Sequence, residues 1–324
     1  MYQSGNGGNV GGIIGSAVGS DADDCVIRVT DCGNSGAVIN TNGQAAGIIG
    51  EVRSDSTENN ITANANTADV SATDNAGGVI AYMAGGGTIC DNTNSGSIVG
   101  KNADKNTGGI CGTVQDDSCI FDNCLNTGDV YADGNAGGIC GYVGDSEHAK
   151  PFTFTGNNNS GTVKSAEKSA GGICGNLDSD NANHLVSGNS NEGSVTGHGF
   201  GGGIIAYMAG GGKFNKNANS GEIRSETENC GGIIGEIQDD MCYFKSSENS
   251  GEITAQADGR HAGQIVGWDG GRGCTIDNDL LYSGTLFGSG VAVIVLTALS
   301  LLVIVGAVVV IIIDKKRSRK SDAK

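Results

Sequence analysis

The sequence predicts an all-β protein: a parallel β-solenoid, or β-helix, of about nine rungs of about 31 residues, followed by one transmembrane α-helix. Three observations lead to this prediction. A Gly-Gly-aliphatic-x-Gly phrase recurs along the chain, an Asn-Ser/Thr-Gly phrase recurs in step with it, and one long apolar segment lies near the C-terminus. A fixed period of this size is typical of stacked structural units.

The first phrase is clearest at residues 108–112, which read Gly-Gly-Ile-Cys-Gly. Nine copies occur at intervals of 29 to 35 residues. They begin at Gly11, Ala46, Gly77, Gly108, Gly137, Gly171, Gly202, Gly231 and Gly263. A repeat in this range predicts rungs that contact only their neighbours and stack like residues in columns.

The second phrase supplies the remaining strands and the corners. An aliphatic residue lies four positions after its Asn, and an apolar residue lies five positions before it. Its copies lie at Asn34, Asn66, Asn94, Asn126, Asn159, Asn191, Asn219 and Asn249. We therefore expect three short strands per rung, with this Asn at a left-handed corner that Asn and Gly tolerate. Nine rungs about 4.8 Å apart would extend roughly 40 Å.

A longer period is superimposed on the rungs. Residues 79–87 read VIAYMAGGG and residues 204–212 read IIAYMAGGG, and Gln-Asp-Asp occurs at both 115–117 and 238–240. These matches indicate duplicated blocks of four rungs. A motif that recurs by duplication is weak support for a unique active site.

The repeated phrases resemble the GLUG-motif repeats of bacterial surface proteins, over residues 11 to about 285. The resemblance implies a relation to large secreted or wall-associated adhesins and peptidase-like surface proteins, in which the repeats are structural or binding modules. This chain departs from the motif in having Cys inside three copies of the phrase.

Composition and charge narrow the classes of partner. The 324 residues include 58 Gly and one Pro, which suits a turn-dense repeat, and the formal net charge is −17. The segment 314–324 contains six basic and two acidic residues, so the rest of the chain has a net charge of −21. A surface this acidic repels nucleic acid and anionic lipid, and we expect no nucleic-acid partner.

The apolar segment predicts a single-pass membrane protein. Val291 to Ile313 is 23 residues of mostly Val, Ile, Leu and Ala, long enough to cross a bilayer, and basic residues follow at once. We expect an extracellular repeat ectodomain at 1–285, a linker at 286–290, a plasma-membrane helix at 291–313 and a cytoplasmic tail at 314–324. The alternative is a buried hairpin or a tail-anchored cytosolic protein. Residues 1–20 lack a signal peptide, so we expect Met1 not to be the true start.

Eleven cysteines occur, an odd number. Cys111, Cys140 and Cys174 stand where other rungs have Ile or Val, so we expect small buried hydrophobic side chains there. Cys119 and Cys242 are predicted to share one column, and Cys32 and Cys124 another. An extracellular location would permit disulfides, and the spacing gives no zinc motif.

A glycan-active enzyme is the catalytic alternative, and we expect the chain not to be an enzyme. Gln-Asp-Asp and the Gly-flanked His198 are similar to two motifs of polygalacturonase-type hydrolases, which use paired carboxylates. Here the motifs are 80 residues apart and no Arg-x-Lys follows. The residues concerned are Asp116, Asp117, Asp239, Asp240 and His198.

Calcium is the only cofactor that the sequence suggests. Asp21, Asp23 and Asp24 lie close together, as do Asp178 and Asp180, and hard oxygen ligands on turns bind Ca²⁺. No calcium-solenoid nonapeptide or EF-hand loop occurs, so we favour solvated acidic turns.

These features together predict an adhesion or display protein that binds extracellular glycans, proteins or partner surfaces along an elongated face, where weak equivalent contacts add. The alternatives are a passive stalk for a missing N-terminal domain and the polysaccharide-active enzyme above. Tyr82 and Tyr207, equivalent by duplication, are the candidate outward-facing binding residues, with burial as the alternative.

Overall fold

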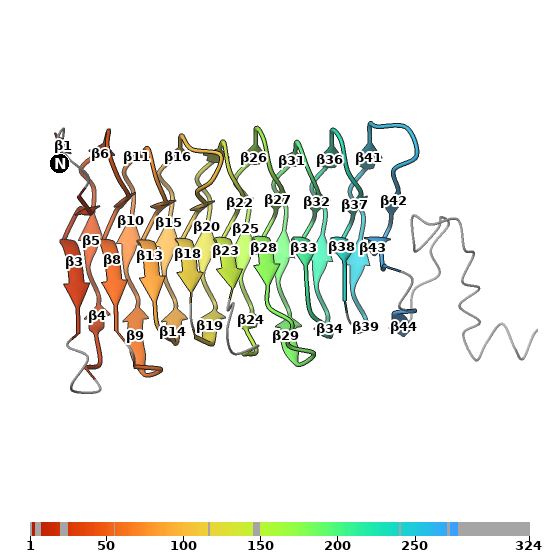
Figure 1. The fold of residues 1–324 in the computed structure, drawn as a ribbon, viewed down its shortest axis with the longest axis horizontal. Coiled ribbons are helices and arrows are strands. Elements are labelled where there is room, and N and C mark those ends of the chain that lie inside the picture. The colour runs from red at the N-terminus through yellow and green to blue at the C-terminus, as the bar shows by residue number, and fades with distance from the viewer. Residues whose placement is uncertain are drawn as a thin grey trace, which may run out of the picture. The chain divides into compact units, whose positions relative to one another are not determined.

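The computed structural model describes residues 2–3, 8–19, 25–54, 56–115, 117–144, 150–239, 241–270 and 273–277. These residues form a parallel β-solenoid of about eight turns, which confirms the predicted repeat architecture (Figure 1). The strands belong to one compact unit, Met1–Val291, and a second unit, Ala292–Lys324, lies outside the described residues. No helix in the described ranges is long and apolar enough to cross a membrane, and the predicted span 291–313 falls outside them.

Five parallel sheets make up the coil. Each of the eight complete turns contributes one strand to each sheet, β1 precedes the first turn, and a ninth, partial turn adds one strand to each of three sheets. The strands that begin each rung form sheet I: β2 (Val10–Gly11), β7 (Ala45–Ala46), β12 (Ala76–Gly77), β17 (Thr107–Gly108), β22 (Ala136–Gly137), β27 (Ala170–Gly171), β32 (Gly201–Gly202), β37 (Cys230–Gly231) and β42 (Ala262–Gly263). The strands that follow form sheet II: β3 (Ile14–Val18), β8 (Ile49–Arg53), β13 (Ile80–Ala84), β18 (Cys111–Gln115), β23 (Cys140–Gly144), β28 (Cys174–Asp178), β33 (Ile205–Met208), β38 (Ile234–Ile237) and β43 (Val266–Trp268).

The other three sheets complete each rung. Sheet III consists of β4 (Arg28–Thr30), β9 (Asn59–Thr62), β14 (Gly87–Cys90), β19 (Cys119–Asp122), β24 (Thr153–Thr155), β29 (His184–Ser187), β34 (Gly212–Asn215), β39 (Cys242–Lys245) and β44 (Thr275–Asp277). Sheet IV consists of β5 (Gly33–Asn34), β10 (Ala65–Asn66), β15 (Thr93–Asn94), β20 (Leu125–Asn126), β25 (Asn158–Asn159), β30 (Ser190–Asn191), β35 (Ala218–Asn219) and β40 (Glu248–Asn249). Sheet V consists of β1 (Tyr2–Gln3), β6 (Val38–Asn40), β11 (Val70–Ala72), β16 (Ile98–Gly100), β21 (Val130–Ala132), β26 (Val163–Ser165), β31 (Val195–Gly197), β36 (Ile223–Ser225) and β41 (Ile253–Ala255). We number the rungs 1 to 9 from β2 onward.

The expectation of three strands per rung was therefore wrong, because the structure has five. Sheets II, III and V contain the three apolar points that the sequence shows. Sheets I and IV are two-residue strands built largely from Ala, Gly and Asn, residues that carry no strand signature. Their strands form because each backbone is paired with identical backbone in the rungs above and below.

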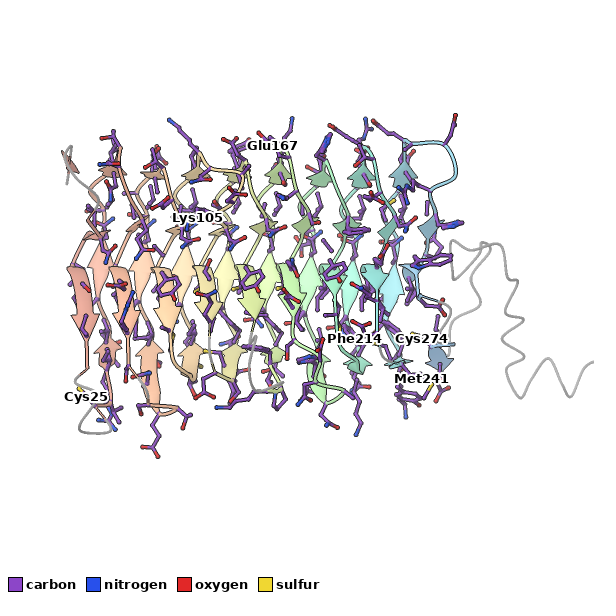
Figure 2. All side chains as sticks on the ribbon, viewed as in Figure 1. Cys25, Lys105, Glu167, Phe214, Met241 and Cys274 are labelled. Carbon is purple, nitrogen blue, oxygen red and sulfur yellow. The ribbon has the colours of Figure 1, made fainter. Side chains whose placement is uncertain are left out.

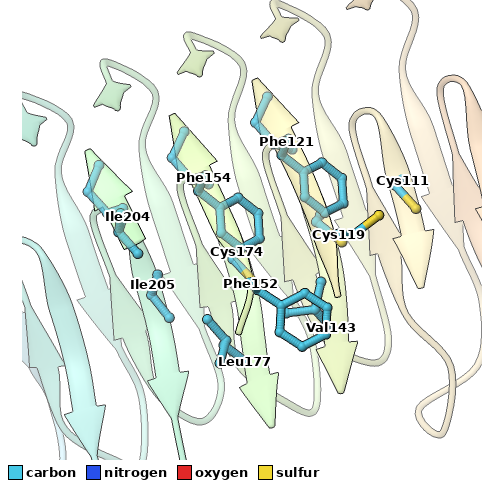
Figure 3. Packing of buried hydrophobic residues seen from close by; sticks show 14 of the residues in the cluster. Cys111, Cys119, Phe121, Val143, Phe152, Phe154, Cys174, Leu177, Ile204 and Ile205 are labelled. Atoms are coloured by element: carbon cyan, nitrogen blue, oxygen red, sulfur yellow. The ribbon is translucent and has the colours of Figure 1, made fainter. Parts of the chain in front are cut away.

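The interior is filled by in-register columns of apolar side chains. Ile80, Cys111, Cys140, Cys174 and Ile205 pair directly from rung to rung in sheet II, and all are fully buried. In sheet III, Phe121 stacks on Phe154 with ring centroids 4.8 Å apart (Figure 3). The three phrase cysteines are thus small buried hydrophobic residues, as predicted.

The cysteine columns are confirmed, but their members are not close enough to bridge. Cys119 and Cys242 lie four rungs apart, and Cys32 and Cys124 three, so each pair is separated by more than about 14 Å. None of the eleven cysteines, all of which lie in the described ranges, forms a disulfide. Cys242 and Cys274 are in adjacent rungs, and the Cys242 amide donates to Sγ of Cys274 at 3.3 Å.

The Asn of the second phrase is not at a left-handed corner, which corrects that prediction. Positive φ occurs three residues earlier, between sheets III and IV, for example at Asp91, Asn123 and Gly156. The phrase Asn instead points inward and forms a ladder: Nδ2 of Asn126 donates to Oδ1 of Asn159, and Nδ2 of Asn159 to Oδ1 of Asn191, both at 2.8 Å. Each Nδ2 also donates to the carbonyl oxygen two residues on, as Asn159 does to Gly161 at 2.8 Å.

A second ladder runs parallel to the first, two residues earlier in each rung. Asn157 donates from Nδ2 to Oδ1 of Asn189 at 2.9 Å, and Asn189 donates to Asn217 at 3.0 Å. Cys124 and Cys32 occupy this column in rungs 4 and 1, where their amides donate to the next Asn. The two ladders provide hydrogen-bond partners for the Asn carboxamides that form a polar stripe inside the coil.

The two sequence phrases meet across this stripe. A Cβ placed on Gly138, the second Gly of its phrase, would lie 2.4 Å from Cγ of Asn159 and 2.0 Å from the carbonyl oxygen of Gly172. The same close approach occurs at Gly109 with Asn126 and at Gly172 with Asn191. Glycine is required there because no side chain fits, and the two phrases recur in step because they pack together.

Candidate functional site

The outward face of sheet II carries an in-register column that we call the outer column. Its members, one per rung, are Ser16, Glu51, Tyr82, Thr113, Tyr142, Asn176, Tyr207, Glu236 and Trp268. An aromatic ring occurs in every second rung from rung 3 to rung 9. Tyr82 and Tyr207 therefore lie in one outward column, and both are half-buried.

A second column faces it from the residue just before each strand of sheet I, and we call it the corner column. Its members are Asn9, Gln44, Asn75, Asn106, Asn135, Ser169, Phe200, Asn229 and His261. Each stands seven residues before the outer-column member of its rung, and several such pairs are in contact. Asn229 donates to Glu236 at 2.8 Å, and the rings of Phe200 and Tyr207 stack at 5.4 Å.

The two columns line a groove in rungs 4 to 7. Its volume is about 450 Å³, and its lining includes Asn106, Asn135, Tyr142, Asn176, Phe200 and Tyr207. Four consecutive rungs span three strand separations, so the groove extends about 14 Å along the coil axis. Amides and aromatic rings dominate the lining, with one basic residue, Lys168, and one acidic residue, Asp104.

The Tyr142 ring lies flat against its own strand. A Cβ on Gly144 would meet the Tyr142 hydroxyl at 2.2 Å and ring atom Cε1 at 2.6 Å. The hydroxyl donates to Oδ2 of Asp178 in the next rung at 3.1 Å, and the Tyr82 hydroxyl donates likewise to Oε1 of Gln115 at 2.7 Å. These contacts hold both rings along the outer column.

One amide in the groove is unsatisfied. Oδ1 of Asn176 is the one buried side-chain polar atom of the described chain that has no hydrogen-bond partner. A buried acceptor in this state costs about 1–3 kcal/mol. Asn176 stands between Tyr142 and Tyr207 in the outer column, at the centre of the groove.

The end of the groove at Tyr207 has a negative electrostatic environment. Burial raises the pKa of the Tyr207 phenol to about 12, and the carboxylates of Asp178, Asp239 and Glu236 add to the shift. Burial also raises the pKa of the Glu236 carboxyl above its usual range, although the amide of Asn229 opposes the change. An anionic ligand would meet repulsion here.

The candidate hydrolase residues are not brought together. Asp117 and Asp239 follow sheet II strands at the corner marked by Met241 in Figure 2, four rungs or about 19 Å apart. His198 directly follows β31 of sheet V, at the corner between sheets V and I, where Nδ1 contacts Oε2 of Glu226 at 3.0 Å.

Asp117 is itself engaged, since it is buried and accepts from Lys150 at 2.7 Å. The remaining two candidates, Asp116 and Asp240, lie outside the described residues. The described members of the set therefore supply no carboxylate pair at a separation suited to glycoside hydrolysis.

Of the candidate calcium ligands, some lie in the described part of the chain and some do not. Asp21, Asp23 and Asp24 lie outside the described residues. Asp178 and Asp180 are exposed, and Asp178 accepts the Tyr142 hydroxyl. No group of three or more His, Cys, Asp or Glu side chains that could hold a metal ion occurs among the residues that the structure describes.

Several groove residues escaped the sequence analysis, notably Asn106, Asn135, Tyr142, Asn176 and Phe200. A signal was present, because the outer column is the residue directly after each Gly-Gly phrase and the corner column is two residues before it. Reading these two positions through all nine copies displays both walls of the groove.

Comparison with known proteins gives no relative: no family model, curated protein or solved structure matches the chain.

Proposed function

We propose that the chain is a membrane-anchored cell-surface protein whose solenoid binds extended extracellular polymers along the groove between the outer and corner columns. The observation that carries the proposal is the aromatic ring at every second rung, which repeats one binding contact along one axis. Repeated equivalent contacts suit a long ligand, because weak interactions add by avidity. The resemblance to GLUG-motif surface proteins supports the same role.

Anchoring is the second part of the proposal. The apolar segment 291–313 would span the plasma membrane, with the basic segment 314–324 in the cytoplasm and the repeats outside. Protease added to intact cells that express the full chain should remove an epitope in the solenoid and leave one at the C-terminus. Deletion of 291–313 should move the chain to the soluble fraction, and an unchanged membrane fraction would contradict anchoring.

Binding is tested with the full chain in mild detergent on immobilised polysaccharides and extracellular-matrix proteins. We expect retention on at least one polymer without release of reducing ends, and weaker retention for Tyr142→Ala. No retention on any surface would contradict the binding role and favour a stalk. Release of reducing ends that disappears in Asp116→Asn or Asp240→Asn would instead identify a hydrolase.

A further inference from the structure

We propose that the ligand of the groove is an uncharged, extended, β-linked polysaccharide whose sugar rings alternate in orientation along the coil axis. The inference rests on the proposed binding function and adds the chemical class of the ligand. Three independent features of the groove support it: the spacing of its rings, the polar groups between them and its charge.

The spacing matches a two-residue repeat. Tyr142 and Tyr207 are two rungs apart, which is about 10 Å between equivalent ring positions. In an extended β-1,4-linked chain each pyranose advances by roughly one strand separation and is turned over relative to its neighbour. The same face of the sugar therefore recurs at every second ring, as the aromatic rings do. An α-1,4-linked glucan curves into a helix and cannot follow a straight row.

The rings are placed to act as platforms. Tyr142 lies flat over Gly144, so its second face is turned away from the strand. In rung 7 the ring of Phe200 stacks on that of Tyr207 with the two ring planes inclined by 29°, and both residues line the groove. The apolar C–H face of a pyranose packs on such surfaces, while its hydroxyls extend sideways to hydrogen-bonding groups.

Hydrogen-bonding groups lie between the platforms. Asn176 occupies the intervening rung, and its Oδ1 has no partner among the described residues. Asn106 and Asn135, linked by a 3.0 Å hydrogen bond, supply further amides on the opposite wall.

Charge excludes acidic polymers. Asp178, Asp239 and Glu236 are close enough to Tyr207 to disfavour its ionisation, and Lys168 is the single basic residue among the described lining residues. A polyuronate or a sulfated glycan would carry its negative charges into this field. A neutral chain brings only hydroxyl or acetamido groups, which the amides can bind.

The experiment measures calorimetric affinity of the full chain in detergent for four probes: cellohexaose, the hexamer of β-1,4-linked N-acetylglucosamine, maltohexaose and polygalacturonate. We expect binding to at least one β-linked probe and at least tenfold weaker binding to maltohexaose and polygalacturonate. Tyr142→Ala and Tyr207→Ala should each lower the affinity for the β-linked probe about tenfold, and Tyr142→Phe should retain most of that affinity. Tyr131→Ala is the matched control, because Tyr131 is 40% exposed on sheet V, outside this groove.

The outcomes separate this inference from the proposed function. Equal or stronger binding of maltohexaose or polygalacturonate would overturn the ligand class while leaving a polymer-binding role. Retention on matrix proteins without binding of any of the four probes would also overturn the ligand class and leave a polymer-binding role. A β-linked probe whose affinity is unaffected by both tyrosine variants would show that binding occurs elsewhere on the chain.

Discussion

At the scale of single residues, the solenoid depends on matched glycines and asparagines. Gly138 leaves room for the carboxamide of Asn159, which in turn links Asn126, Asn191 and the Gly161 carbonyl. Because each buried carboxamide is both donor and acceptor to its neighbours, removing one leaves several groups unpaired. Such groups are costly in a dry interior.

Asn159→Ala should therefore lower the free energy of unfolding by several kcal/mol, since each buried group left without a partner costs about 1–3 kcal/mol. Urea denaturation followed by circular dichroism measures the change. The matched control is Asn158→Ala, which alters the adjacent, half-buried position of β25 and should change stability by about 0.5 kcal/mol or less. Equal effects at both positions would refute the role of the ladder.

The ladder also shows what a sequence pattern leaves open. The recurrence of Asn34, Asn66 and their equivalents was visible, but Asn serves equally well at a left-handed corner and in a buried ladder. The deciding fact is that the second Gly of the other phrase faces it across the interior. That relation is between residues 16 to 22 positions apart, and local turn chemistry does not contain it.

At the scale of elements, sheet II has a column of buried thiols on its inward face and a column that contains aromatic rings on its outward face. Its inward residues in rungs 4 to 6 include Cys111, Cys140 and Cys174, and its outward residues line one wall of the groove. Burial raises the pKa of Cys140 and Cys174 well above 9.0, the ordinary value of a thiol. Burial likewise raises the pKa of Cys124 and Cys230 to about 12.

These shifts predict that stability falls in alkali. Below pH 9 the thiols are protonated in both folded and unfolded chains; between the unfolded pKa near 9 and the higher folded pKa, only the unfolded chain releases protons. Each such thiol then costs up to about 1.4 kcal/mol of stability per pH unit. Cys174→Val should reduce the slope of unfolding free energy against pH, measured between pH 8 and 10.5 with reductant present.

Ile205→Val is the control for that comparison, because Ile205 occupies the next place in the same column and does not titrate. It should shift the stability at every pH by a similar amount. A slope that is the same for the wild type and for Cys174→Val would contradict the assignment of this thiol as buried and protonated.

Prediction from the sequence succeeded unevenly among the elements. Sheets II, III and V were foreseen from aliphatic and aromatic positions such as Val130 and Phe154. Sheets I and IV were not, since pairs such as Ala136–Gly137 and Leu125–Asn126 owe their strand geometry to stacking rather than to propensity. For the site, Tyr82 and Tyr207 could be proposed as outward. The residues of both columns can be read from the positions beside each Gly-Gly phrase, but only the fold shows that the two columns face each other.

At the scale of the whole solenoid, each rung contacts only its neighbours, so stability is expected to propagate along one dimension. Damage to one middle rung should then weaken that region more than the ends, unlike a globular core that unfolds as one unit. Among the described residues, Gly138 in rung 5 is a suitable position for a disruptive substitution, because an added Cβ would lie 2.0 Å from the Gly172 carbonyl oxygen.

Gly138→Val should raise amide hydrogen exchange most strongly in β22 to β31 and progressively less toward β7 and β42, as measured by mass spectrometry of peptic fragments. Gly33→Val is the matched control, because no heavy atom lies within 4 Å of a Cβ at Gly33, and exchange in rungs 4 to 6 should be unchanged. The groove spans the affected rungs, so the same variant should lose polymer retention while the first and last rungs keep their protection. A uniform rise in exchange over all rungs would show that the coil unfolds as a single cooperative body and would contradict nearest-neighbour propagation.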